Sequence, residues 1–329
     1  MTAVPPATCS QAGCTLPQGG KCLENLTATT CPHYGKAPTP VQTTVAPAAI
    51  GVAGHSFGLS AAEAGDLLAM KPANVILLAG DSNSGKTTLF AAIYERLLDG
   101  PFGEFVFAGS KTLHGFESRS YQNRGGYGHS EPDTPHTPTS NPNPILHLRV
   151  APKARLAHPI DIMLIDVSGE LFKLARNNAA VLSEVPGLRR ADHVGVLLDG
   201  ELLSSLEKRQ GCILSTKQII EACLSAGFIG KSTSLDLIVT KYDLIRPNAQ
   251  AEEFVDEKLA NFESMFTPRL AQVRSYKTAA RDPKMDLERG YGLVPLLAAW
   301  VEPFVAAPGR TPRDGKAVLR EVAYGGTPQ

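Results

Sequence analysis

One segment of the sequence constrains the fold more than any other: Gly80-Asp81-Ser82-Asn83-Ser84-Gly85-Lys86-Thr87, followed by Thr88. It comes after a continuous apolar run of strand length, residues 74–79, and before a stretch with helical periodicity, residues 87–98. A strand that is apolar at every position is buried on both faces, as in parallel sheets. The segment therefore predicts a strand, a glycine-rich turn and a helix in direct succession.

The spacing of the glycines, lysine and threonine in this turn suits phosphate binding. Backbone N–H groups of such a turn and the helix N-terminus converge on a β-phosphate, and Gly80 and Gly85 permit the tight path. Lys86 would bring a point charge to the β- and γ-phosphates, and the Thr87 hydroxyl would reach Mg²⁺. A chance loop of this composition is the alternative, which the strand before it and the helix after it disfavour. The turn predicts a nucleoside triphosphate without naming its base.

The rest of the chain alternates strand and helix patterns. Ser60 and Glu63 form a capping-box pattern for a helix over 60–70. Further strands are expected at 104–108, 145–150, 160–165, 193–198, 235–239 and 273–276, and further helices at 201–226, 250–266 and 292–305. This alternation predicts an α/β fold with a mainly parallel sheet and helices on both faces.

Composition divides the chain into four parts. Residues 1–37 are rich in Cys, Gly, Pro and Thr, residues 38–71 hold a linker and the short helix, residues 72–306 form the nucleotide-binding domain, and residues 307–329 form a flexible tail. Residues 110–144 break the strand–helix rhythm with five prolines and three histidines. They are expected to form a long functional loop or a disordered insertion.

Two motifs follow other predicted strands and narrow the choice of nucleotide. Asp166, directly after the strand at 160–165, can hold Mg²⁺ through water, and Gly169 can offer its N–H to a γ-phosphate. After the strand at 235–239 comes Thr240-Lys241-Tyr242-Asp243. A carboxylate at Asp243 can accept from N1–H and the exocyclic amine of guanine, a pair that adenine does not offer, and the Lys241 stem can lie along the base.

A weaker signal follows the last predicted strand, in Lys277-Thr278-Ala279-Ala280. A small residue here would bring a backbone N–H close to guanine O6. Taken alone, the segment is equally well read as a plain turn at the end of a strand.

In this order, the four segments resemble the Ras-like superfamily of P-loop GTPases. The resemblance implies that residues 80–88 bind phosphate, Asp166–Gly169 form the second switch, and Thr240–Asp243 and Thr278–Ala280 read guanine. Glu170 stands where Ras-type proteins have a water-orienting Gln, so it is either a catalytic residue beside Lys86 and Gly169 or a solvent-facing switch residue. The first-switch threonine, a Mg²⁺ ligand, is assigned to Thr137, with Thr134 and Thr139 as neighbouring candidates.

Asn83 raises the question of a second cation. In potassium-activated GTPases an Asn at the corresponding position of the loop helps to coordinate K⁺ beside the phosphates. Asn is also a good turn former, so the residue is open to both interpretations.

The cysteines Cys9, Cys14, Cys22 and Cys31 lie within 23 residues of one another and are followed by His33. Four clustered thiols in a cytosolic protein favour structural Zn²⁺, which would supply the folding energy of a segment without a core. An untethered reduced tail and disulfides are the alternatives, because the spacing lacks the close pairs of a zinc ribbon. Cys212 and Cys223 are read as small buried apolar residues.

The Cys-rich start together with the patterns VILLAGDSNSGKTTL, LIDVSGE and VTKYD is similar to a bacterial group called double-GTPase domains, found in predicted phage-defence or conflict gene clusters. This resemblance implies a protein partner, either a second GTPase or an effector encoded nearby.

Charge and hydropathy exclude several other classes. The formal net charge is 0 and no long basic run is present, which disfavours nucleic acid and membrane surfaces as partners. No apolar stretch has the length of a membrane span, and the signal-peptide pattern is absent from the start, so a cytoplasmic location is expected.

Three functions remain. The favoured one is a GTP-hydrolysing switch that binds GTP or GDP with Mg²⁺, together with Zn²⁺ and possible K⁺. An ATPase or small-molecule kinase is the second, and the third is a nucleotide-bound scaffold that does not hydrolyse and joins partners through the zinc module.

Overall fold

The structure, a computed structural model, describes residues 8–10, 14–22, 25–36, 57–123, 145–184, 190–281 and 286–302. The chain divides into two compact units, residues 1–50 and 51–329. The predicted Mg²⁺ ligand Thr137, most of the linker before residue 57 and the tail over 307–329 lie outside the described residues.

Within the first unit, the two ends of the described segment pair with each other. Cys9 forms an antiparallel bridge with Tyr34, and the Thr8 carbonyl accepts a hydrogen bond from the Gly35 amide at 2.8 Å. The Ser10 hydroxyl lies 3.1 Å from Nδ1 of His33. One short 3₁₀ helix, η1 (Leu16–Gln18), lies between these ends.

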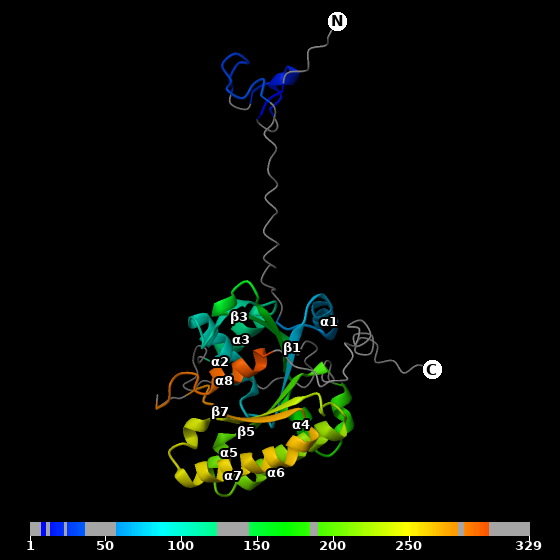
Figure 1. The fold of residues 1–329 in the computed structure, drawn as a ribbon, viewed down its shortest axis with the longest axis vertical. Helices are drawn as coiled ribbons and strands as arrows, with labels where there is room; N and C mark the ends of the chain where they lie inside the picture. The colour runs from blue at the N-terminus through cyan, green and yellow to red at the C-terminus, as the bar shows by residue number, and fades with distance from the viewer. Residues whose placement is uncertain are drawn as a thin grey trace, which may run out of the picture. The chain divides into compact units, whose positions relative to one another are not determined.

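In the second unit, seven strands of the described residues form one sheet in the order β2-β3-β4-β1-β5-β6-β7 (Figure 1). Strand β3 runs antiparallel to both of its neighbours, whereas β4, β1, β5, β6 and β7 are mutually parallel. The predicted mainly parallel α/β sheet is confirmed. The strands are β1 (Ala73–Ala79), β2 (Phe105–Gly109), β3 (Ile145–Pro152), β4 (Ile160–Asp166), β5 (His193–Asp199), β6 (Ser234–Thr240) and β7 (Gln272–Lys277).

The helices connect these strands. They are α1 (Ala61–Met70), α2 (Lys86–Asp99), α3 (Leu113–Asn123), α4 (Gly169–Ala175), α5 (Gly200–Ser204), α6 (Arg209–Ser225), α7 (Ala249–Phe266) and α8 (Leu293–Val301). Short 3₁₀ turns are η2 (Lys153–Arg155), η3 (Ala179–Glu184), η5 (Tyr242–Leu244) and η6 (Thr267–Arg269). The predicted capping box is present at α1, where Ser60 Oγ accepts from the Glu63 amide and the Glu63 carboxylate accepts from the Ser60 amide.

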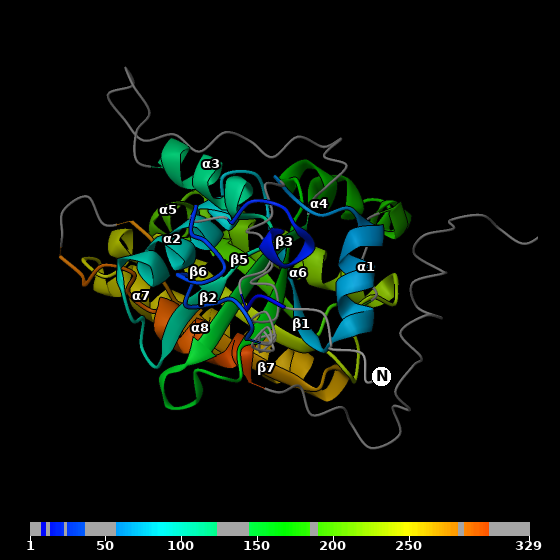
Figure 2. The same cartoon turned by 90° about the horizontal axis from the view of Figure 1, so that it is seen from above.

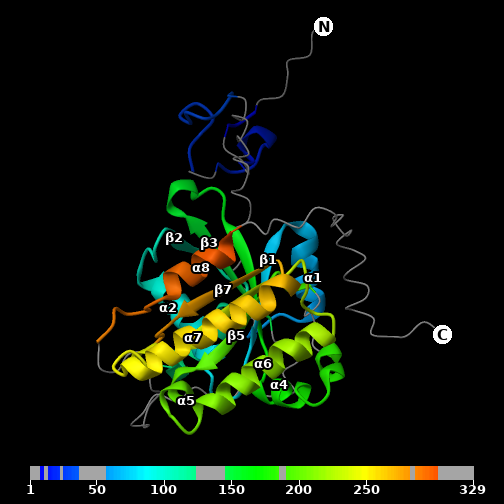
Figure 3. The same ribbon diagram turned by 60° about the horizontal axis from the view of Figure 1, so that its bottom comes forward.

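Two hydrophobic cores cover the two faces of the sheet. Along β1, Val75, Leu77 and Ala79 face a core shared with α1, α4, α6 and α7, and Ile76 and Leu78 face a core shared with α2, α3 and α8. This alternation has the period of two expected of a strand. Figure 3 shows α6 and α7 side by side on one face, and Figure 2 shows α2 beside α3 on the other. The central strand is therefore buried on both sides, as its apolar run predicts.

The single helix expected over 201–226 is wrong, because the structure has α5 and α6 with a break at residues 205–208. Asp199 caps α5 by accepting from the Glu201 amide at 3.0 Å. The Ser204 hydroxyl then donates to the Glu201 carbonyl at 2.9 Å, and Ser205 takes an extended conformation. Serine side chains that bond to nearby backbone compete with helix continuation, which explains the early end of α5.

Part of the predicted insertion over 110–144 is an ordered helix, α3. Phe116 is fully buried and stacks on Tyr94 of α2 with ring centroids 4.8 Å apart. The Tyr94 hydroxyl donates to Glu117 at 2.5 Å. Gly115 packs so closely on the Phe57 carbonyl that a Cβ there would lie 2.1 Å from its oxygen. The contacts of Phe116 and Glu117 with Tyr94 therefore hold α3, the first part of this segment, against α2.

A buried carboxylate ties the last helix to the sheet. Asp236 of β6 is fully buried and accepts from Trp300 Nε1 and from Arg274 Nε, each at 3.0 Å. Trp300 is itself 1% exposed. A buried carboxylate without hydrogen-bond donors is destabilising, so the N–H of Trp300 contributes to stability. The buried area of its ring contributes as well.

Replacing Trp300 with Phe keeps most of the apolar contact and removes the N–H donor. We expect the free energy of unfolding to fall by about 1–3 kcal/mol, measured by urea denaturation followed by circular dichroism. The matched control is Tyr121→Phe, at a side chain that is 59% exposed, which should change stability by less than about 0.5 kcal/mol. Equal stabilities of the Trp300 variant and the parent would contradict this role for the N–H.

Candidate functional site

The predicted site residues follow the carboxyl ends of four parallel strands. In an open α/β sheet these ends meet at one edge, where ligands bind. The turn over residues 80–85 follows β1, and the other three segments follow β4, β6 and β7. In register, Leu78 of β1 pairs with Asp166 of β4, so the carboxylate lies beside the start of the turn.

The turn between β1 and α2 depends on unusual backbone angles. Gly85 caps α2 with φ 92°, and Asn83 has φ 65°. Only glycine adopts such angles freely, and Asn tolerates them better than other side chains do. The turn directs the first residues of α2 back over the end of the strand, which is the geometry of a backbone anion cradle.

Lys86 lies at the centre of this turn. Its side chain is buried, with the whole residue 6% exposed, and Nζ donates to the carbonyls of Gly80 at 2.9 Å and Asp81 at 2.8 Å. Burial lowers the pKa of Lys86 to about 8, partly offset by the charge of Asp166. A buried ammonium held mainly by carbonyl dipoles gains from an anion, so this position favours a phosphate.

Beside it lies a hydroxyl–carboxylate pair. The Thr87 hydroxyl donates to Asp166 Oδ1 at 3.4 Å, and Asp166 is fully buried. Oxygen donors of this kind, with waters, are the ligands that Mg²⁺ prefers, so the residues present fit that ion. The second carboxylate oxygen accepts from Arg119 Nε at 3.1 Å. The sequence contained no signal for Arg119, because it lies in the segment that we expected to be a loop or an insertion.

The segment after β4 lies directly against the turn. A Cβ at Gly169 would be 2.3 Å from the Ser82 amide nitrogen, so only glycine fits. Ser168 caps α4, and the Glu170 carboxylate, two residues further on, accepts from the Ser82 hydroxyl at 2.8 Å. The Glu170 side chain is 55% exposed. Glu170 therefore contacts the turn and also faces solvent.

Two residues that the sequence analysis did not single out hold the turn from its other side. Arg176 Nη2 pairs with Asp81 at 3.4 Å, and Arg176 Nη1 lies 2.6 Å from the Ser215 hydroxyl. That hydroxyl donates to Asp81. The turn is thereby linked to α6 and to the end of α4, a link made by residues far apart in the sequence.

The segment after β6 is bonded to the same turn. The Thr240 hydroxyl donates to the Ser84 carbonyl at 2.8 Å. Lys241 has φ 51°, and its ammonium donates to Asp199 at 3.0 Å and Glu201 at 2.9 Å. Asp243 lies half-buried in η5. The structure therefore brings the Thr240–Asp243 segment and residues 80–87 into one site.

The segment after β7 joins this group through its backbone. The Thr278 amide donates to the Val239 carbonyl at 2.7 Å, and the Thr278 carbonyl accepts from the Tyr242 amide at 3.0 Å. The Ala279 amide, which belongs to the segment Thr278–Ala280 that the sequence assigned to the base, donates to the Tyr291 carbonyl at 3.1 Å. Ala280 packs partly buried against the core shared with α2 and α8.

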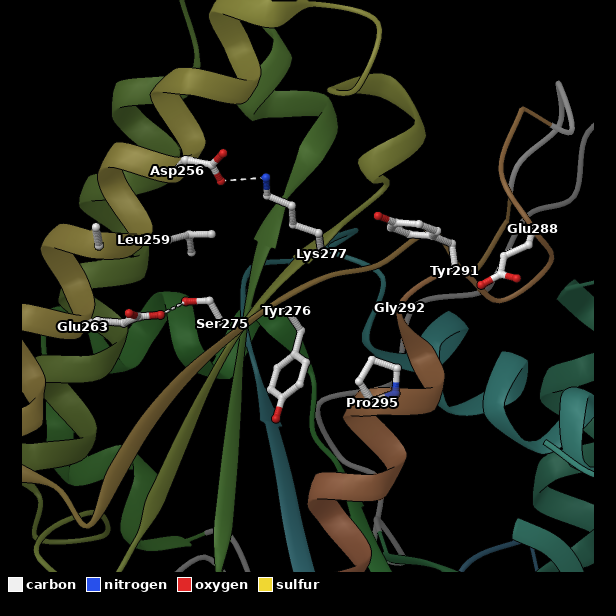
Figure 4. A pocket seen from close by; sticks show the side chains of 11 residues that line it. Asp256, Leu259, Glu263, Ser275, Tyr276, Lys277, Glu288, Tyr291, Gly292 and Pro295 are labelled. Carbon is white, nitrogen blue, oxygen red and sulfur yellow. Dashed lines mark hydrogen bonds and ion pairs between the residues drawn. The ribbon is translucent and has the colours of Figure 1, made fainter. Parts of the chain in front are cut away.

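A groove of about 690 Å³ lies beside this segment, between β7, α7 and the start of α8 (Figure 4). In the close-up, Lys277 pairs with Asp256 at 2.6 Å, and Ser275 donates to Glu263. Tyr276 and Pro295 line the opposite side. The groove lies along the edge strand β7, and no residue of the turn over 80–87 lines it, so it is separate from the site expected to bind phosphate.

The four cysteines predicted to bind zinc all lie in the first unit. Cys22 is buried and Cys9, Cys14 and Cys31 are partly buried, and among the described residues no three His, Cys, Asp or Glu side chains form a group that could hold a metal ion. The zinc prediction therefore has no support here. In the second unit, burial raises the pKa of Cys212 to about 11 and that of Cys223 to about 12, as suits inert apolar thiols.

The described helices were compared with the requirements of a membrane span. Within the parts of the chain that the structure describes, no helix combines the length and the apolar character that a bilayer crossing requires.

The sequence matches the model of one known protein family. The model of the family Double-GTPase 2 matches residues 74–301. Among curated proteins no significant match was found.

Solved structures resemble the chain only distantly. Bacterial selenocysteine-specific elongation factor EF-Sec is 15% identical with a TM-score of 0.32, over 64% of this chain and 26% of its own. The signal recognition particle receptor SRb-GTP/SRX complex from Chaetomium thermophilum gives 16% and 0.39, over 70% and 97%. The elongation factor SelB from Methanococcus maripaludis gives 12% and 0.36, over 71% and 35%. The chain spans about a quarter of EF-Sec, and none of these similarities bears on function.

The contact between Gly169 and Ser82 is testable by substitution. In Gly169→Ala the new methyl group would meet backbone atoms, so we expect the free energy of unfolding to fall by about 1–3 kcal/mol, measured by urea denaturation. In the matched control Gly211→Ala, at an open helical position with nothing within 4 Å, stability should stay the same or rise by up to about 1 kcal/mol. Equal effects of the two substitutions would contradict the close packing.

Proposed function

Since this chain belongs to the Double-GTPase 2 family, we propose that it binds GTP and GDP with Mg²⁺, hydrolyses GTP, and acts as a molecular switch. One observation carries the proposal furthest: the Thr240 hydroxyl donates to the Ser84 carbonyl at 2.8 Å. That bond joins the segment expected to read the base to the turn expected to hold the phosphates. A site with both parts in contact suits a guanine nucleotide lying between them.

On the phosphate side, each residue has a separate task in this proposal. Lys86 and the amides of residues 80–88 hold the β- and γ-phosphates, and Thr87 and Asp166 hold Mg²⁺. The bound ion would neutralise charge that develops on the phosphates. Gly169 lies against Ser82, so its amide is well placed to sense a γ-phosphate. Glu170 either orients the attacking water or remains a solvent-facing residue, since a carboxylate beside phosphates is repelled by them.

On the base side, the Asp243 carboxylate accepts from N1–H and the 2-amino group of guanine. The Lys241 ammonium, held by Asp199 and Glu201, extends the side-chain stem so that it can lie along the base. Thr278, Ala279 and Ala280 close the pocket near O6. Because the Ala279 amide is bonded to Tyr291 in this structure, the contact with O6 requires a local rearrangement or the Ala280 amide.

Switching follows from the position of α4. Its first residue, Gly169, contacts the turn, and its last turn leads to Arg176, which pairs with Asp81. A γ-phosphate entering beside Ser82 would displace this helix and change the surface over residues 168–184. That surface is the proposed contact for a protein partner, a second GTPase or effector of a bacterial defence-type system.

Two other functions stay distinguishable. An ATPase or small-molecule kinase would bind adenine nucleotides, and a scaffold would retain its nucleotide for hours without turnover. Chromatographic identification of the nucleotide that co-purifies with the protein separates the first alternative. A time course of that nucleotide, together with a zinc assay on the same sample, separates the second.

Asp243→Asn tests the base assignment. The variant loses one acceptor, so we expect GTP affinity to fall at least about a hundredfold, measured by competition against a fluorescent GDP analogue. Affinity for xanthosine triphosphate should rise instead, because xanthine has a carbonyl where guanine has the 2-amino group, and the Asn amide can donate to it.

The matched control is Asp66→Asn on the exposed face of α1, which should bind GTP as the parent does. Unchanged guanine preference in Asp243→Asn would contradict guanine reading by this residue and favour the ATPase or kinase.

Asn83→Gly tests the possible K⁺ site. Glycine accepts φ 65° without strain, so the turn keeps its path while the side-chain oxygen is lost. We expect GTP hydrolysis by the parent to be several-fold faster in KCl than in NaCl of equal ionic strength, and the difference to vanish in the variant. Equal rates in both salts for the parent would leave Asn83 as a turn former alone.

A further inference from the structure

The guanidinium of Arg119 occupies an unexpected place in the site. Arg119 Nε donates to Asp166 Oδ2 at 3.1 Å, and Nη1 donates to the Gly115 carbonyl at 3.0 Å. The side chain of Arg119 is 15% exposed, and that of Asp166 is 0% exposed. The other oxygen of the same carboxylate accepts from Thr87. The Asp166 carboxylate therefore links Arg119 to Thr87 in the first turn of α2.

Helix α3, which carries Arg119, is held in place by its contacts with α2. Helix α3 lies beside α2 in Figure 2, and Phe116 stacks on Tyr94 between the two helices. The Glu117 carboxylate accepts from the Tyr94 hydroxyl. Because these contacts fix the helix, the guanidinium can change partner by side-chain rotation alone.

Asp166 has two competing roles. In the proposed function it holds Mg²⁺, whereas in this structure it pairs with Arg119. A guanidinium and a divalent cation repel each other when they share one carboxylate. Arg119 must therefore leave Asp166 when the metal-bound nucleotide enters, and an almost buried guanidinium then needs another anion.

Two other carboxylates of the described residues, one in the turn and one on α3, already have partners. Asp81 pairs with Arg176 and accepts from Ser215, and Glu117 accepts from Tyr94. The phosphates expected over Lys86 and Thr87 would bring anions close to Asp166, the carboxylate that Arg119 contacts in this structure. Arginine suits them because its planar fork binds phosphate oxygens in pairs and stays charged at all relevant pH values.

We propose that Arg119 is a catalytic residue supplied by the chain to its own site: it neutralises Asp166 before nucleotide binds and moves onto the γ-phosphate when GTP binds. The inference rests on the proposed function. In the reaction, a water oxygen bonds to the γ-phosphorus and the bond from that phosphorus to the β–γ bridging oxygen breaks. GDP leaves with the bond's electron pair, and the proton of the water goes to inorganic phosphate. Arg119 stabilises the negative charge that develops on the γ-phosphoryl oxygens and the bridging oxygen.

The test compares Arg119→Gln with Arg119→Lys in the full chain. Single-turnover hydrolysis of GTP in Arg119→Gln should fall at least about a hundredfold, while affinity for a fluorescent GTP analogue changes less than about threefold. The Mg²⁺ concentration that half-saturates binding of a fluorescent GDP analogue should fall, because a competitor for Asp166 is gone. Arg119→Lys, which keeps the charge and the buried pair, should fold as the parent does and show intermediate turnover.

Arg269→Gln is the matched control, because Arg269 pairs with Glu221 at the surface. It should leave both hydrolysis and the Mg²⁺ dependence unchanged. Hydrolysis within about threefold of the parent in both Arg119 variants would overturn the catalytic role, as would an equal loss in the control. A parent that binds GTP without detectable hydrolysis would overturn this inference and leave nucleotide binding standing. A parent that binds no GTP would overturn the proposed function itself.

Discussion

The burial of β1 on both faces is the constraint on which the rest of the molecule depends. Its side chains alternate between two hydrophobic cores, and β4 and β5 flank it in the sheet. A strand so enclosed can end only at the edge of the sheet, where the chain turns through Gly80–Gly85 into α2. Because the neighbouring strands run parallel, Asp166 and Thr240 end at the same edge. The residues that follow β1, β4 and β6 are therefore brought together at that edge, whereas Arg119, Arg176 and Ser215 reach it from the surrounding helices.

The site is also a balance of buried charges. Lys86 is held by carbonyls, Asp166 by Arg119 and Thr87, and Asp81 by Arg176 and Ser215. Arg119, Arg176 and Ser215 come from three different parts of the chain, so their contacts connect the turn to α3, α4 and α6. A phosphate entering such a site changes the partner of more than one group at once. This is the physical basis for expecting nucleotide binding to be felt on the surface of the domain.

Much of the fold was predictable, and particular residues show why. The apolar runs of β1, β4, β5 and β6 carry their own strand signal, and Ser60 with Glu63 marks the start of α1. The break between α5 and α6 was not predictable, because it depends on which backbone carbonyl the Ser204 hydroxyl reaches. Helix α3 was missed since its apolar content is low and its anchor, Phe116, is stabilised by a ring on another helix.

The sequence by itself determined the glycine-rich turn between strand and helix, the order of the motifs and the mainly parallel sheet, because each of these depends on local spacing and periodicity. Only the tertiary structure decided which residues surround the turn. Arg119 lies 47 residues before Asp166, which it contacts. Arg176 and Ser215 lie 95 and 134 residues after their common partner, Asp81. Such contacts arise when strands and helices pack, and no local pattern in the chain encodes them.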